Sequence, residues 1–159
     1  MQIRTASPKD AQPITDLINL AFEVERPFMQ GDRIAIEDVQ RRIDIGKFFL
    51  AEDDAGIAGC VYIELQNDRS YLGLLSIDPA RQGTGLGKKL MSIAEQYARD
   101  HGSRAMDLLI LNLRTELPPF YLRLGYAEDG TAPFPDNGRQ RQPCHFIKMS
   151  KPLIPEARF

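Results

Sequence analysis

Apolar residues recur along the first part of the chain at helical spacing, three or four positions apart. One such pattern covers residues 11–22 and a second covers residues 36–45, and each predicts an amphipathic helix with one face on a core. A short strand-like run, residues 3–6, precedes the first helix. Residues 23–33 lose the period, so the sequence predicts an irregular connection between the two helices.

Short apolar runs separated by turn residues then predict consecutive strands. Residues 48–51 and 57–65 flank the acidic turn 52–56 and form a predicted hairpin. A polar turn at residues 67–70 leads into the next run, residues 71–77. We therefore expect three antiparallel strands in this part of the chain.

The third helical pattern covers residues 86–101 and separates two strand-like runs. The run that follows it, residues 106–113, is almost continuously apolar, which is typical of a strand buried on both faces and lying parallel to its neighbour. Together with residues 71–77, the sequence predicts a β-α-β unit.

The last part of the chain alternates short elements with loops. Residues 118–125 begin with prolines and end with glycine, which predicts a short helix, and Tyr126 resumes extended structure. Residues 131–143 are rich in proline, glycine and arginine and predict a loop, and residues 145–149 form the last predicted strand.

Composition narrows the class of protein. The chain has 159 residues, of which 43% are hydrophobic and 26% charged, which is typical of one ordinary globular domain over residues 1–159. The start of the chain has no signal-like apolar run and no segment reaches membrane-spanning length, so we expect a cytoplasmic protein without a membrane partner. A net charge of −2 argues against nucleic acid as the partner.

The two cysteines indicate neither a disulfide framework nor a metal site. Cys60 and Cys144 are too few for the former, and neither stands at metal-ligand spacing with His101 or His145. We expect reduced, structural thiols and no metal.

A glycine-rich turn connects the predicted strand to the third predicted helix. Gly83, Gly85 and Gly87 bring backbone N–H groups and a helix N-terminus to one point, which predicts a phosphate site. A Walker loop is excluded because only three residues separate Gly83 from Gly87 and Lys89 replaces the hydroxyl residue. A dinucleotide fingerprint is excluded because the third glycine comes one residue early. The pattern that remains is Gln82-x-x-Gly85-x-Gly87.

This pattern resembles the [Gln/Arg]-x-x-Gly-x-[Gly/Ala] loop of the GNAT superfamily of N-acetyltransferases. Residues 74–79 look like the fourth strand of that family, and residues 120–126, Phe-Tyr-Leu-Arg-Leu-Gly-Tyr, look like its C-terminal signature. The resemblance implies a mixed α/β fold, with a mostly antiparallel sheet of about seven strands, a central parallel pair and about four flanking helices.

The resemblance also implies acetyl-CoA as the cofactor. Its pyrophosphate would bind the N–H groups of residues 83–88, and its pantetheine would bond to the main chain at Leu75 and Ile77. The N–H group of Ile77 would polarise the thioester carbonyl. The implied cofactor-binding residues are Leu75, Ser76, Ile77, Gln82, Gly83, Thr84, Gly85, Leu86, Gly87, Lys88, Asn112 and Tyr121. The chain departs from the family at Arg114, where asparagine is usual, and Asn112 stands two residues earlier.

Tyr121 is the implied general acid, because a phenol is protonated at neutral pH and can reprotonate the departing thiolate. An alkyl amine is mostly protonated at that pH, so the reaction also needs a proton acceptor. Glu64, near the end of its predicted strand and on the face of Cys60 and Tyr62, is the best-placed carboxylate. His145 and a chain of water molecules stay open as alternatives.

The expected acceptor is a primary amine of a small molecule or a protein. The resemblance places its entry between residues 23–33 and residues 131–143, where Glu25, Arg26, Arg139 and Arg141 are candidate specificity residues. The alternative function is a non-catalytic acyl-CoA sensor or regulatory module, and the spacing disfavours a nucleotide-binding protein. The sequence leaves open the acceptor, the acyl group and a homodimer.

Overall fold

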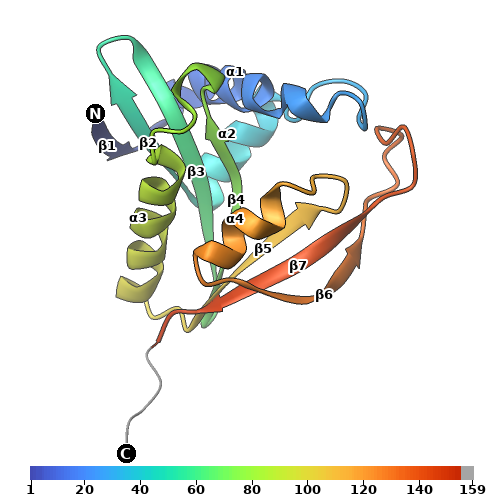
Figure 1. Cartoon of the computed structure of the whole chain (residues 1–159). Helices are drawn as coiled ribbons and strands as arrows, with labels where there is room; N and C mark the ends of the chain where they lie inside the picture. Colours follow the sequence, from blue (N-terminus) through green and yellow to red (C-terminus); the bar gives the residue numbers. More distant parts are fainter. Residues whose placement is uncertain (155–159) are drawn as a thin grey trace, which may run out of the picture.

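Seven strands form one mixed sheet in the order β1-β2-β3-β4-β5-β7-β6 (Figure 1). The computed structural model describes residues 1–154, so the last five positions of the predicted 1–159 domain lie outside the described residues. All neighbouring strands are antiparallel except the central β4–β5 pair. The strands are β1 (Gln2–Thr5), β2 (Lys47–Asp53), β3 (Gly56–Gln66), β4 (Arg69–Ile77), β5 (Ala105–Leu111), β6 (Ala127–Pro133) and β7 (His145–Pro152).

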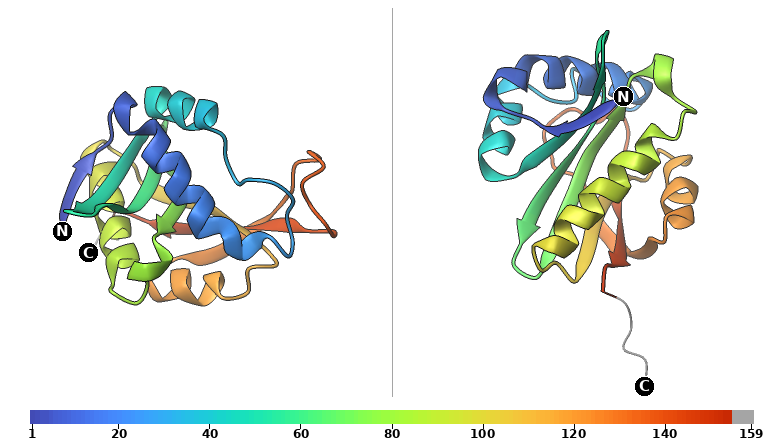
Figure 2. Two further views of the ribbon diagram at one scale, coloured as in Figure 1. Left: turned by 90° about the horizontal axis from the view of Figure 1, so that it is seen from above. Right: turned by 90° about the vertical axis from the view of Figure 1, so that its left-hand side faces the viewer.

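Two α-helices cover each face of the sheet (Figure 2). Helices α1 (Ala11–Ala21) and α2 (Ile36–Ile45) lie on one face, and α3 (Leu86–Asp100) and α4 (Leu117–Arg123) lie on the other. The short 3-10 helices are η1 (Pro8–Asp10), η2 (Phe22–Glu25) and η3 (Pro79–Arg81). The predicted fold class is confirmed. None of the helices in residues 1–154 is long and apolar enough to cross a bilayer.

Two predicted boundaries near the end of the chain are wrong. The predicted loop 131–143 starts later, because β6 continues to Pro133 by pairing with β7. The last strand continues from Met149 to Pro152, because it pairs with β5 back to Ala105. Both extensions depend on long-range pairing that local residue preferences do not specify.

The sheet separates two hydrophobic cores. Helix α3 buries Leu90, Met91 and Ala94 against one face of the sheet, in a cluster that also contains Tyr121. Helix α1 buries Ile14 and other apolar side chains on the opposite face, in a cluster with Cys60, Tyr62 and Leu74. Burial of both faces accounts for the strongly apolar central strands.

The central parallel pair of strands is short, and the two strands separate beyond it. Only Arg69–Tyr71 of β4 pair with Ala105–Asp107 of β5. Beyond them, β4 follows β3 while β5 follows β7, so the two strands separate. A bulge in β4 accompanies the separation: Cys60 and Tyr62 are two positions apart, whereas their partners Ser76 and Gly73 are three apart. The extra residue, Leu74, has a left-handed φ of 55°.

A buried polar network connects α3 to Tyr126, which precedes β6, and to β7. The Tyr126 hydroxyl donates a hydrogen bond to Glu95 Oε2 at 2.8 Å, and Lys151 Nζ donates to Glu95 Oε1 at 2.7 Å. Glu95 is only 5% exposed, so its carboxylate oxygens depend on these donors for hydrogen bonds.

We predict that Tyr126→Phe lowers the free energy of unfolding by about 1–3 kcal/mol, because the buried Glu95 carboxylate loses a donor. Urea unfolding measures the difference. Tyr97→Phe is the matched control: Tyr97 is also on α3, and its hydroxyl makes no hydrogen bond to any of residues 1–154. Equal losses in the two variants would contradict the role of the network.

Candidate active site

The separation of β4 and β5 opens a cleft of about 800 Å³. The cleft extends from the glycine turn before α3, past β4, β5 and α4, to the connection that follows η2 and the loop between β6 and β7. Residues far apart in the sequence therefore face one cavity.

The glycine turn forms one end of this cleft. Gly83 and Gly85 have φ values of 82° and 79°, which L-residues adopt at a cost, and a Cβ on either would meet nothing within 4 Å. The first hydrogen bond across the start of α3 runs from Lys89 N to Gly85 O. The N–H groups of residues 86–88 therefore have no acceptor within the helix and are available to bind an anion.

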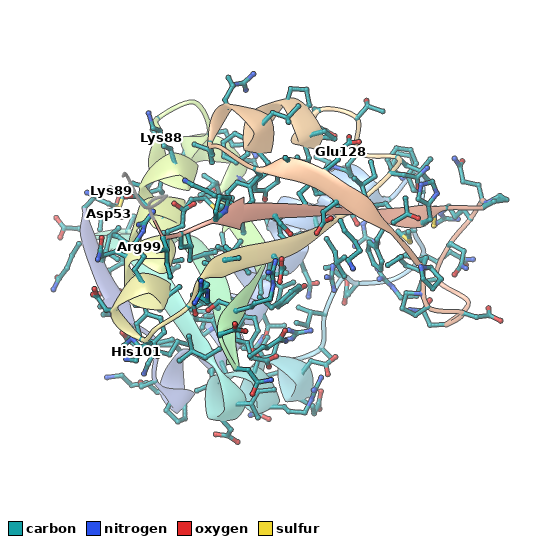
Figure 3. All side chains as sticks on the ribbon, turned by 90° about the horizontal axis from the view of Figure 1, so that it is seen from below. Asp53, Lys88, Lys89, Arg99, His101 and Glu128 are labelled. Atoms are coloured by element: carbon teal, nitrogen blue, oxygen red, sulfur yellow. The ribbon has the colours of Figure 1, made fainter. Side chains whose placement is uncertain are left out.

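Side chains around the turn hold its shape and add positive charge. The Thr84 hydroxyl donates to Arg81 O at 2.7 Å, and Arg81 pairs with Asp53. Figure 3 shows Lys88 and Lys89 on the first turn of α3, with Asp53 nearby and Arg99 and His101 at the far end of the helix. Lys88 lines the cleft, so the turn combines free N–H groups with a cation.

Strand β4 provides the wall next to the turn. Leu75 and Ile77 line the cleft, whereas Ser76 lies on the opposite face, is 1% exposed and donates its hydroxyl to Leu74 O at 3.0 Å. Beyond Tyr71, β4 has no partner on its β5 side, so main-chain groups along this edge face the cleft.

Tyr121 lies in α4 and lines the same cleft. Its ring packs edge-on against Phe120 and Tyr126, with centroid separations of 5.0 Å and 5.9 Å. The side chain is 7% exposed, and burial raises the pKa of Tyr121 to about 12, an effect that Arg114 partly offsets. The hydroxyl is therefore protonated throughout the neutral and mildly alkaline range.

Glu64 does not lie with Tyr121. Its carboxylate accepts two hydrogen bonds from side chains of its own strand. The Tyr62 hydroxyl donates to Glu64 Oε1 at 2.9 Å, and Gln66 donates to Glu64 Oε2 at 2.7 Å. Glu64 is absent from the lining of the cleft, and Tyr62 belongs to the core under α1 and α2. Its role as proton acceptor stays a prediction.

Asn112 and His145 also lie outside the cleft lining. The Asn112 side chain accepts a hydrogen bond from His145 N at 2.9 Å, and Asn112 N donates to His145 O at the same distance. These bonds extend the β5–β7 ladder by one pair. The structure therefore gives Asn112 a role in the sheet, and it brings most but not all of the expected cofactor-binding residues to the cleft.

Two segments close the far end of the cleft. Gln30 N donates to Arg139 O at 2.7 Å and Arg141 N donates to Phe28 O at 2.8 Å, on either side of a β-bridge between Met29 and Gln140. Figure 1 shows the two segments side by side. The expected entry between residues 23–33 and 131–143 is therefore closed at this bridge, and the two segments form a continuous wall.

The lining of the cleft contains charged residues that the sequence did not single out. Arg33 and Arg42 line the cleft, and Glu25, one of the candidate specificity residues, accepts a hydrogen bond from Arg114 Nη1 at 2.7 Å. The sequence did contain a sign that Arg42 faces the interior: it stands three positions after Val39, on the buried face of α2.

The family model described as Acetyltransferase (GNAT) domain matches residues 23–153. The chain belongs to the GNAT acetyltransferase family. It is 25% identical to streptothricin acetyltransferase of Streptomyces lavendulae, over 95% of this chain and 94% of the relative.

Solved GNAT structures share the fold across nearly the whole chain. The aminoglycoside 6'-N-acetyltransferase complexed with coenzyme A has a TM-score of 0.79 at 20% identity, with 99% of this chain and 100% of that chain covered. The structure of yncA from Salmonella typhimurium with its cofactor acetyl-CoA has a TM-score of 0.74 at 20% identity, with 99% and 96% covered. The prediction of an acyltransferase enzyme is confirmed, and CoA is confirmed as the cofactor of such GNAT relatives.

The glycine turn yields a matched pair of variants. Gly85→Ala should destabilise the protein by about 1–2 kcal/mol, because alanine is strained at this positive φ, and should weaken CoA binding about tenfold if the turn rearranges to relieve that strain. Gly87→Ala should be tolerated, because its Cβ would come no closer than 3.6 Å to its nearest neighbour, Phe120. Thermal unfolding and calorimetric titration with CoA measure both effects. Equal behaviour of the two variants would contradict the prediction.

Proposed function

We propose that the protein transfers an acetyl group from acetyl-CoA to a primary amine by direct attack of the amine on the thioester. The observation that carries the proposal is a single cleft that contains the glycine turn, the unpaired edge of β4 and the buried phenol of Tyr121. Its relatives by sequence and fold are named for acetylation of streptothricin and of an aminoglycoside, which are amine-bearing acceptors.

The backbone supplies the cofactor site. The N–H groups of residues 86–88 and the side chain of Lys88 would hold the pyrophosphate, and the unpaired main-chain groups at Leu75 and Ile77 would bind the pantetheine. When bound, acetyl-CoA supplies the activated acyl group. A fixed N–H donor at Ile77 that is aimed at the carbonyl oxygen would lower the barrier by about 3–4 kcal/mol.

Tyr121 is the proposed general acid. Its phenol carries a proton over the whole working range because burial raises its pKa to about 12. It would donate this proton to the thiolate of CoA as the carbon–sulfur bond breaks. Phe120 and Tyr126 fix the ring on two sides, which orients the hydroxyl.

The incoming ammonium group must lose a proton before it attacks. Glu64 is the carboxylate predicted from the sequence, yet it lies outside the cleft lining. Glu25 is a carboxylate in the lining, 8% exposed and oriented by its 2.7 Å bond from Arg114. The position of Glu25 makes it the stronger candidate, and Glu64 becomes the second.

Tyr121→Phe should reduce kcat by a factor of about a hundred or more, because the thiolate leaves without a proton donor. The affinity for CoA should be nearly unchanged, since the variant keeps the ring and its packing. Steady-state kinetics with a panel of amines and calorimetric titration with CoA separate the two effects.

The same variant tests the alternative function. A non-catalytic acyl-CoA sensor predicts tight CoA binding, no turnover with any amine and no effect of Tyr121→Phe on the output. Full turnover by Tyr121→Phe would exclude Tyr121 as the acid while leaving the acetyltransferase intact.

A pH profile separates the two carboxylates. We expect Glu25→Gln to lower kcat/KM at about pH 7.4, where only about one part in a thousand of an alkyl amine is neutral, and to lower it much less near pH 10, where roughly a quarter is neutral. Tyr121 stays protonated at both values because of its raised pKa.

Glu64→Gln is the paired variant and should change kcat/KM by less than about threefold at either pH, because a group that contacts no reacting atom contributes little. A loss confined to Glu64→Gln at neutral pH would instead establish Glu64 as the proton acceptor. A loss in Glu25→Gln that persists near pH 10 would show that Glu25 only positions Arg114.

A further inference from the structure

The far end of the cleft is rich in positive charge. Besides the cations of the glycine turn, the lining contains four arginines and two glutamates. These residues are Glu25, Arg33, Arg42, Arg114, Glu116 and Arg139.

A single arginine, Arg114, pairs with both glutamates. Its Nη1 lies 2.7 Å from Glu25 Oε2, and its Nε lies 3.3 Å from Glu116 Oε1. Within the described residues, no carboxylate lies within salt-bridge distance of Arg33, Arg42 or Arg139. This part of the cleft lining therefore has more positive charge than its own acids neutralise.

Arg33 is the most exceptional of these residues. Its side chain makes no hydrogen bond to any of residues 1–154, and its guanidinium stacks on Phe22 at 5.3 Å from the ring centroid. Burial lowers the pKa of Arg33, attraction to Glu25 opposes this, and repulsion from Arg139 and Arg42 lowers it further. Arg33 is half-buried and has no carboxylate partner in the described part of the chain, so its guanidinium can pair with an anionic ligand in the cleft.

Arg42, on α2, also stacks its guanidinium on an aromatic ring. Its guanidinium lies 5.0 Å from the centroid of the Tyr62 ring, and its Nε is buried with no hydrogen-bond partner among the described residues. Two stacked guanidinium groups, Arg33 from the connection after η2 and Arg42 from α2, thus reach the lining of the cleft. Planar guanidinium groups bind carboxylates and phosphates through paired N–H donors.

We infer that the amine acceptor carries an oxyanion, a carboxylate or a phosphonate, which Arg33 and Arg42 bind at the far end of the cleft. This inference rests on the proposed N-acetyltransferase function and specifies its substrate class. Arg139, which donates its Nε to Gln30 O at 3.2 Å, ties the wall together and adds to the positive potential. A polycationic amine would meet repulsion at the same place.

The test compares amines that differ only in the distal group. Acetylation by the full chain is measured with glycine, β-alanine, γ-aminobutyrate and aminomethylphosphonate, with the carboxamides of the three carboxylates, and with putrescine. We expect at least one oxyanion-bearing amine to exceed its uncharged or cationic counterpart in kcat/KM by about tenfold or more, because a charge-assisted bond in a cleft is worth that much. The carboxylate and phosphonate arms identify which oxyanion is preferred.

Arg33→Gln and Arg42→Gln should each lower kcat/KM for the preferred oxyanion-bearing amine about tenfold, because KM rises. The affinity for CoA should be unchanged. Arg41→Gln is the matched control, because Arg41 is the neighbour of Arg42 on α2, pairs with Asp38 and does not line the cleft. Calorimetric titration of the CoA-bound protein with the same amines provides a readout that does not require turnover.

The outcomes separate the two proposals. If kcat/KM for the carboxamides or for putrescine equals that for the oxyanion-bearing amines, the inference is overturned. The proposed acetyltransferase activity would still be supported. Arginine-dependent binding of an oxyanion without acetylation would support the anion site and count against the proposed activity. If the protein neither binds nor acetylates any of the oxyanion-bearing amines, the inference is overturned.

Discussion

The early separation of β4 from β5 is the constraint on which the rest of this structure depends. Three residues on each strand pair, and each strand then follows a different neighbour. The sheet remains continuous, but beyond Tyr71 its center is open. The bulge at Leu74 belongs to this arrangement, because the extra residue rotates the strand and leaves Leu75 and Ile77 on the cleft.

Most of the groups that face the proposed cofactor belong to the backbone. N–H donors at the start of α3 and the edge of β4 depend on geometry rather than on side-chain identity, with Gly83 and Gly85 as exceptions because of their positive φ. A site of this kind tolerates extensive sequence change. The aminoglycoside 6'-N-acetyltransferase shares this fold with a TM-score of 0.79 at only 20% identity. Specificity for the acceptor must then come from the side chains at the far end.

The features predictable from the sequence are those encoded locally. The glycine turn and Tyr121 were both recognisable, because each belongs to a short motif with a fixed relation to a helix, and the structure brings both to the cleft. Glu64 was placed correctly on the face of Tyr62, but strand alternation does not reveal which part of a face borders a cavity. Arg33 and Arg42 were missed because the cleft they share forms only when α2 and the connection before it pack on the sheet.

The central claim is that the opening between β4 and β5 binds acetyl-CoA through main-chain groups, with Tyr121 next to the sulfur. A crystal structure of the protein with CoA tests this most directly. The account predicts the pyrophosphate on the N–H groups of residues 86–88, pantetheine bonded to the main chain of Leu75 and Ile77, and the sulfur within hydrogen-bond reach of the Tyr121 hydroxyl. A CoA molecule bound elsewhere, or a sulfur on the far side of the sheet from Tyr121, would contradict it.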